Sequence, residues 1–436
     1  MPLQLQFLLV IPQGSAVAFV VLLRHHHFSI NTKATDSTMA STQANITAAT
    51  ASPDPGNLMV SLAPLPGEAL ETAIANLALA FPGQNILVAT PNTAAPQLSS
   101  GSPLRLLPYT ATAPTANPWV LTPDDYRNTF LLADQNNATT CLLLGAEAQT
   151  LHPEAIRSLA TAARTADLTV AHYRLGPHEG LVNSAILYPV TRALFCTEPR
   201  FPLANDLGFS LRMAERLAAA ADRFVAIGQP DAVIWPVSEA ATSLFTIAEA
   251  DAGVRTFPLP DSIDFNTLFS QITGSLFADI DAKASFWQRG RALPPLRTFS
   301  HHPAPPDSRT DITPMLEAFH LAYTNLHEIW SLVLPPNALL GLKKLSLLAP
   351  DSFRMPDSLW ARIVYDFILA YRLRTINRGH LLGALTPLYL AWVASHLTLV
   401  AQGTVPERHI EDLASTFESD KPYFVSRWRW PDRFNP

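Results

Sequence analysis

A single glutamate stands where an apolar run ends. The stretch CLLLGAE, residues 141–147, stops being apolar at Gly145, and a helical pattern begins at Pro153. We expect a buried strand whose carboxyl end delivers Glu147 to a loop. In open α/β sheets ligands bind at that edge, and paired carboxylates there can hold a hard cation through oxygen ligands. This loop carries one acid, Glu147, where such a site would have two.

The composition limits the partners that the chain can have. It has 436 residues, of which 48% are hydrophobic, and a formal charge of -6. This charge gives no general attraction to nucleic acid, which we exclude as a partner. The two cysteines, Cys141 and Cys196, lie in apolar sequence and suit buried free thiols in a reducing compartment. A cytoplasmic location is therefore expected.

The first 56 residues differ from the rest. The apolar run before Arg24 carries no positive charge ahead of it and is interrupted at Pro12, so we expect no integral membrane span. Residues 28–56 are rich in Thr, Ser, Ala and Asn, a composition typical of disorder. Residues 1–56 are thus interpreted as a disordered or mis-assigned N-terminal extension, with a weak membrane anchor or a signal peptide as alternatives.

Strand-like and helix-like segments alternate from Asn57 onward. The predicted strands are residues 57–64, 84–90, 141–144 and 167–175, and the predicted helices are residues 67–81, 123–136 and 153–166. Residues 91–123 are expected to be a looser connection. This alternation predicts an α/β domain, residues 57–295, with a mainly parallel sheet covered on both faces.

Long helical patterns follow a Pro-rich linker, residues 296–310, and define a helical domain, residues 311–436. Residues 380–397 are apolar nearly all round, which favours a buried core helix, and Pro387 predicts a kink or a break in it. The C-terminal segment SRWRWPDRFNP alternates arginines with aromatic residues, so we expect a docked tail held by cation–π contacts.

Several stretches together resemble bacterial family-2-like glycosyltransferases related to the mannosylglycerate and glucosylglycerate synthases. They are residues 169–195, 201–213, 359–372, 380–395 and 421–436. The resemblance implies a GT-A sugar-nucleotide domain followed by a helical domain. It also implies transfer of a sugar from a nucleoside diphosphate donor to a small hydroxylated acceptor, with retention at the anomeric carbon and with Mg²⁺ or Mn²⁺ as cofactor.

The metal motif departs from that family. The family has an Asp-x-Asp motif where this chain has Gly145-Ala146-Glu147, so replacing Gly145 by Asp is expected to restore a second ligand. Pro260 stands where the family places a metal-binding histidine. Asp261 and Asp264 are nearby oxygens or, alternatively, turn-forming residues. The loop ATPNTAA also lacks the acid that reads the donor base.

Four further residues are implied by the resemblance. Asp206 matches an acceptor-side acid, and Asp231 matches an acid near the acceptor hydroxyl, although a helix N-cap explains Asp231 equally well. Asn183 corresponds to an acceptor contact or caps a helix. Arg127 stands in the region of a donor-phosphate loop or is solvated.

Two functions follow from this pattern. The first is a retaining glycosyltransferase, a hexosyltransferase, in which Asp231 and Asp206 are catalytic, Asn183 and Arg127 bind substrate, and Glu147 binds metal. Its partners would be a sugar nucleotide and a small acceptor. The alternative is a catalytically impaired pseudo-glycosyltransferase that acts as a binding or scaffolding module.

Overall fold

The computed structural model describes residues 57–91, 104–110, 120–229, 232–233, 235–255, 264–289 and 311–431. The N-terminal extension, the linker at 296–310, Asp231, Pro260 and Asp261 lie outside these residues.

Seven strands form one mixed sheet in the order β3-β2-β1-β4-β6-β5-β7. They are β1 (Leu58–Leu62), β2 (Ile86–Thr90), β3 (Leu104–Pro108), β4 (Thr140–Leu144), β5 (Leu168–Tyr173), β6 (Asp206–Ser210) and β7 (Ile247–Gly253). Only β6 runs against its two neighbours, and the other described pairs are parallel. The expected mainly parallel sheet is therefore confirmed. β3 falls inside the stretch that was expected to be a loose connection.

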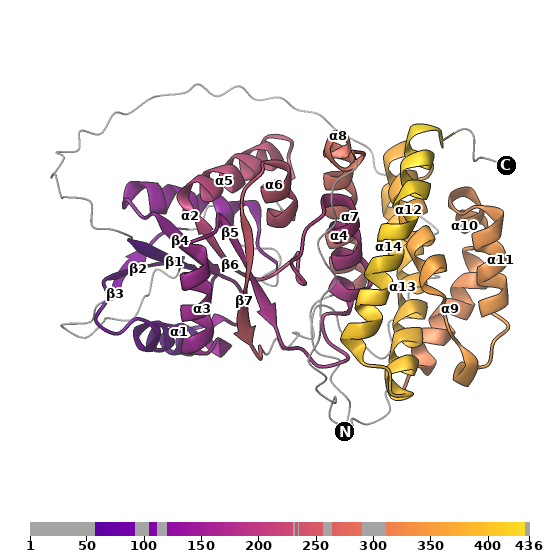
Figure 1. Ribbon diagram of the computed structural model, residues 1–436, viewed down its shortest axis with the longest axis horizontal. Coiled ribbons are helices and arrows are strands. Elements are labelled where there is room, and N and C mark those ends of the chain that lie inside the picture. The colour runs from indigo at the N-terminus through magenta and orange to yellow at the C-terminus, as the bar shows by residue number, and fades with distance from the viewer. Residues whose placement is uncertain are drawn as a thin grey trace, which may run out of the picture.

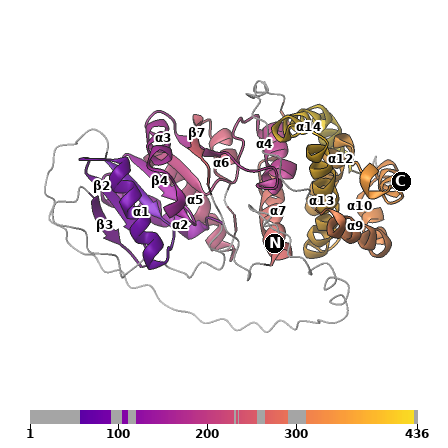
Figure 2. The ribbon, with the colours of Figure 1, turned by 90° about the horizontal axis from the view of Figure 1, so that it is seen from below.

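Helices cover both faces of this sheet. α1 (Gly67–Ala80) and α3 (Pro153–Ala163) pack on one face, and α2 (Pro123–Gln135) and α5 (Leu211–Ala226) pack on the other (Figures 1 and 2). The start of α2 shows why the chain turns into a helix there. The Asp125 carboxylate accepts hydrogen bonds from the backbone N–H of Thr122 at 2.7 Å and from its hydroxyl at 2.9 Å, which closes a capping box.

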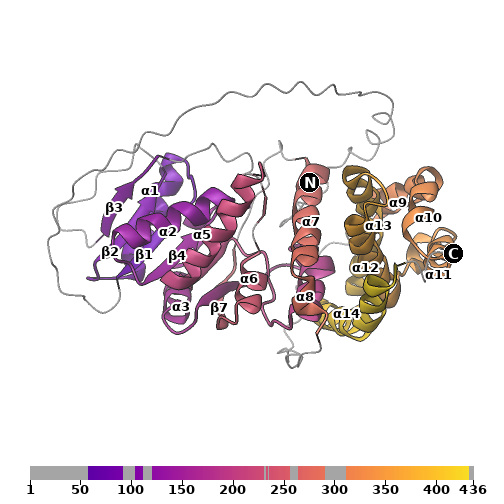
Figure 3. The same cartoon turned by 90° about the horizontal axis from the view of Figure 1, so that it is seen from above.

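A second hydrophobic core is built from helices that come from two parts of the chain. From the middle come a π-helical turn (Asn183–Leu187), α4 (Tyr188–Phe195), α7 (Phe265–Ala282) and α8 (Ala284–Trp287). From the C-terminal part come α9 (Thr313–Asn325), α10 (His327–Val333), α11 (Pro336–Leu345), α12 (Asp357–Leu373), α13 (Arg378–Ala401) and α14 (Pro406–Arg429). Figure 3 shows α7 and α8 between the sheet and the C-terminal helices. With this helical region after the sheet, the predicted fold class is confirmed.

Polar contacts fix α14 to the middle of the chain. Three of its acids have buried partners: Glu407 pairs with Arg200 at 3.0 Å, Glu411 accepts from Tyr188 at 2.5 Å, and Glu418 pairs with Arg192 at 2.7 Å. On α12, the Trp360 indole donates to the Ala185 carbonyl at 2.8 Å. Because these partners are buried, their hydrogen bonds orient the C-terminal helices against the π-helical turn and α4.

α13 is the central helix of the second core. By length and composition it is apolar enough to cross a membrane, but 83% of its apolar window is buried inside the protein, as expected of a core helix. The helix continues through Pro387, so of the expected kink or break, the break does not occur. At the end of α14, the Arg372 guanidinium lies 4.0 Å from the centre of the Trp428 ring, a cation–π contact that joins α12 to α14.

Two histidines are stacked inside this core. The His396 and His409 Nδ1 atoms are 2.7 Å apart, and the His409 Nε2 atom is 3.1 Å from Asp357. The His396 ring also stacks on Trp392 at 5.2 Å between ring centres. Burial, and then the charge of His409, hold the pKa of His396 well below its usual range.

We predict that the protein loses stability as the pH falls below about 6.5, the ordinary pKa of histidine. His396 resists protonation in the folded state and accepts a proton when the protein is unfolded. Each pH unit below this pKa should therefore lower the free energy of unfolding by up to about 1.4 kcal/mol. Urea unfolding between pH 8 and pH 5 measures this loss. The loss should shrink in His396→Gln and persist in His327→Gln, whose side chain is exposed. Equal slopes in the wild type and His396→Gln would contradict the prediction.

Candidate functional site

The carboxyl edge of the sheet brings together two stretches that are distant in sequence. β4 ends at Leu144 and leads into the predicted loop at Gly145. Since β6 is antiparallel to β4, its first residue, Asp206, lies directly opposite Leu144. The reversed strand therefore places Asp206 beside the loop that carries Glu147.

Gly145 is required at its position by a close backbone contact. Its N–H donates to the Asn205 carbonyl at 2.8 Å and lies 3.3 Å from the Asp206 carboxylate. A Cβ atom at residue 145 would lie 2.7 Å from the Asn205 oxygen, closer than real Cβ atoms come. The backbone around Gly145 therefore opposes the aspartate that was expected to restore a second metal ligand.

A buried arginine holds the oxygen atoms of this loop. Arg255, which is 2% exposed, donates from Nη2 to the Ala146 carbonyl at 2.8 Å and from Nη1 to the Glu147 carbonyl. Nη1 also donates to the Thr150 hydroxyl at 3.0 Å. The other partner is Asp206, whose carboxylate oxygens lie 2.9 Å from Nη2 and 2.8 Å from Nε. The guanidinium thus binds both loop carbonyls and the carboxylate at once.

Tyr173, the last residue of β5, completes the cluster. Its hydroxyl donates to Asp206 Oδ2 at 2.9 Å and accepts from the Asp206 N–H at 3.1 Å. Burial, and then the negative charge of Asp206, raise the pKa of the tyrosine well above its usual range, so the phenol stays protonated. Both oxygens of the fully buried Asp206 are occupied by Tyr173 and Arg255, and the carboxylate is closed to an acceptor molecule.

Glu147 is held by its own turn. Its backbone is in the left-handed region, with φ of 60°, and its Oε2 atom accepts from the Gln149 amide at 2.6 Å. Among the residues that the structure describes, no three His, Cys, Asp or Glu side chains are grouped so that they could hold a metal ion. The loop carbonyls that a cation could use already bind Arg255. The residues of this cluster therefore do not fit the divalent metal implied by the sequence.

The remaining candidates lie elsewhere. Asn183 is fully buried in the π-helical turn, which packs against α13 and α14, and its amide has no hydrogen-bond partner within the described residues. Arg127 joins α2 to α5 through an ion pair with Asp222 at 2.7 Å. Asp264 caps α7 by accepting from the Thr267 N–H at 3.0 Å. Of the predicted site residues that the structure describes, Glu147 and Asp206 alone lie in one cluster.

Comparison with known proteins gives a distant structural likeness. No family model and no curated protein matches the sequence. Glucosyl-3-phosphoglycerate synthase from Mycobacterium tuberculosis, solved in complex with uridine diphosphate, matches with 14% identity and a TM-score of 0.33 over 52% of this chain and 80% of that one. The same enzyme with Mn²⁺, uridine-diphosphate-glucose and glycerol 3-phosphate matches with 13% identity and a TM-score of 0.33, over the same shares of the two chains.

Removing the arginine should leave a buried carboxylate without its charge partner. We predict that Arg255→Met destabilises the protein by about 3–5 kcal/mol in urea unfolding, and that Arg255→Lys costs less because it keeps the charge. Arg174→Met is the matched control, since Arg174 pairs with Asp251 and the two side chains are 68% and 64% exposed, and it should cost at most about 1 kcal/mol. Equal losses in Arg255→Met and Arg174→Met would refute a structural role for the buried pair.

Replacing the loop glycine tests the close backbone contact. Gly145→Asp should lower stability by about 1–3 kcal/mol through overpacking and should gain no affinity for Mn²⁺ in calorimetry. Gly67→Asp is the control, because a Cβ there meets nothing within 4 Å and an acid suits the first turn of α1. A Gly145→Asp protein with unchanged stability and new Mn²⁺ binding would contradict this account.

Proposed function

We propose that the chain is a glycosyltransferase-like protein that acts as a binding or scaffolding module. In this proposal it does not carry out metal-dependent sugar transfer at the 145–147 loop. The observation that carries this proposal is the position of Arg255, whose guanidinium binds the carbonyls of Ala146 and Glu147 together with the Asp206 carboxylate. In the resembling enzymes this loop carries the acids that hold the metal. Here a side chain of the protein occupies the loop oxygens.

Electrostatics gives a divalent cation little attraction at this loop. The Arg255 guanidinium repels a cation, and the Asp206 carboxylate, 2.8 Å away, attracts one, so the two contributions largely cancel. Glu147 alone is left to attract the metal.

The neutral pair also cannot replace the metal in its chemical role. A divalent ion in a sugar-nucleotide site neutralises the diphosphate that departs. The Arg255 side chain is fully buried and paired one to one with Asp206, so it presents no net charge to a ligand. Retaining transfer by Asp231 and Asp206 would need a different source of positive charge, and Asp206 is itself enclosed by Tyr173 and Arg255.

Calorimetry with uridine-diphosphate-glucose, with and without Mn²⁺, tests the proposal. We expect Mn²⁺ to leave the affinity and the melting temperature unchanged and expect no release of uridine diphosphate in the presence of small hydroxylated acceptors. Glu147→Gln should behave as the wild type does, because Gln149 can still bind the retained side-chain oxygen. Mn²⁺-dependent release of uridine diphosphate that Glu147→Gln abolishes would overturn the proposal and establish the enzyme.

A further inference from the structure

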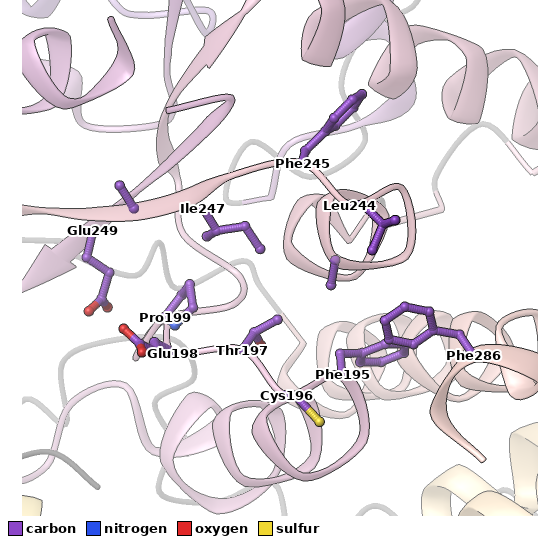
Figure 4. A pocket seen from close by; sticks show the side chains of 12 residues that line it. Phe195, Cys196, Thr197, Glu198, Pro199, Leu244, Phe245, Ile247, Glu249 and Phe286 are labelled. Atoms are coloured by element: carbon purple, nitrogen blue, oxygen red, sulfur yellow. The ribbon is translucent and has the colours of Figure 1, made fainter. Parts of the chain in front are cut away.

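A cavity of about 660 Å³ lies between the edge strand of the sheet and the second core. One wall is the start of β7, at Ile247 and Ala248, and the opposite wall is the segment that follows α4, residues 195–199 (Figure 4). This volume falls in the range of small-molecule sites, which occur preferentially where two units of a protein meet. The cavity is separate from the Arg255 cluster, because it lies at the first residues of β7 and Arg255 follows the last.

One end of the cavity is apolar. The Phe195 and Phe286 rings lie stacked with their centres 6.1 Å apart, and Leu244 faces the same end from the other wall (Figure 4). Leu244 is 76% exposed although it is large and apolar. An exposed leucine above an aromatic pair provides a surface on which an apolar ligand can be buried.

The other end of the cavity is acidic. Glu198 and Glu249 line this end, away from the phenylalanines (Figure 4). The Glu249 carboxylate is oriented by the Arg200 backbone N–H, which donates to it at 2.6 Å, while the Arg200 guanidinium pairs with Glu407. Two carboxylates at one end favour a ligand group that carries positive charge.

A buried polar atom lies between the two ends. Thr197 lines the cavity and is 6% exposed, and within the described residues its hydroxyl has no hydrogen-bond partner. Burying a hydroxyl without a hydrogen bond costs free energy, and a hydrogen bond to a ligand atom can offset that cost. Figure 4 shows this side chain between the two acids and the aromatic pair.

Two residues that line the cavity have unusual backbone angles. Cys196 and Leu244 both line the cavity and both have positive φ, at 57° and 60°. This region is rare for residues other than glycine, and strained residues cluster at ligand sites, where the surrounding structure holds them. Cys196 is the C-cap of α4, so its left-handed backbone ends that helix at the wall that carries Phe195.

We propose that this cavity binds an organic cation with an apolar body, such as an arylalkyl ammonium compound. The ammonium group lies at Glu198 and Glu249, and the apolar body lies between the Phe195–Phe286 pair and Leu244. The proposal is independent of the function assigned to the 145–147 loop.

Calorimetry of the full chain with three probes of similar size tests this site. We expect 4-phenylbutylamine to bind with one-to-one stoichiometry, 4-phenylbutanol to bind at least 10-fold more weakly, and 5-phenylpentanoate not to bind. The double variant Glu198→Gln/Glu249→Gln should remove the preference for the amine over the alcohol. Glu215→Gln is the matched control, since Glu215 is an exposed acid on α5, and it should leave the affinities unchanged.

Two variants test the location. Ala248→Phe places a ring in the cavity and should abolish amine binding. Leu244→Gly removes an apolar wall and relieves the positive φ, so it should weaken binding at least 10-fold without lowering the melting temperature. No amine binding, equal binding of the carboxylate probe, or unchanged amine affinity in a folded Leu244→Gly protein would overturn the proposal.

Discussion

The carboxyl edge of the sheet depends on one buried ion pair. Arg255 and Asp206 are both removed from water, and each is tolerable there only because the other neutralises it and because further hydrogen bonds satisfy their remaining atoms. The pair joins the end of β7 to the start of β6, and the Arg255 guanidinium extends the link to the turn at Ala146 and Glu147. The shape of the loop and the close approach of Gly145 to β6 therefore belong to one arrangement.

Polar contacts hold the helices of the second core together, and a cavity lies where that core meets the sheet. The acids of α14 bind Arg200, Tyr188 and Arg192, so the C-terminal helices are held at the segment around α4. β7 is the edge strand of the sheet within the described residues, and residues 195–199, which follow α4, form the opposite wall of the cavity. The cavity thus occupies the place where the outer edge of the sheet meets the helices without joining them.

The pattern of apolar residues along the sequence was sufficient to predict the buried central strands. The apolar runs that became β1, β2 and β4 are almost entirely buried, and a strand buried on both faces reads as a continuous apolar run. β3 has the same length as these strands but was missed because it is half-exposed and contains Arg105, so it lacks that signal. The sequence also directed attention to Asp206, but its partner Arg255 is 49 positions further along and the Glu147 carbonyl is 108 positions from that arginine. No periodicity in a single sequence links residues so far apart.

The excursion of the chain between β5 and β6 has a consequence for how the protein is made. Two strands that are neighbours in the sheet are separated by the π-helical turn and α4, which leave the sheet and enter the other core. On the ribosome, this excursion and α7 emerge before α12, α13 and α14, whose apolar surfaces cover them. The nascent chain therefore carries exposed hydrophobic helices until its last segments are synthesised, and a truncated product presents those surfaces to chaperones and to other chains.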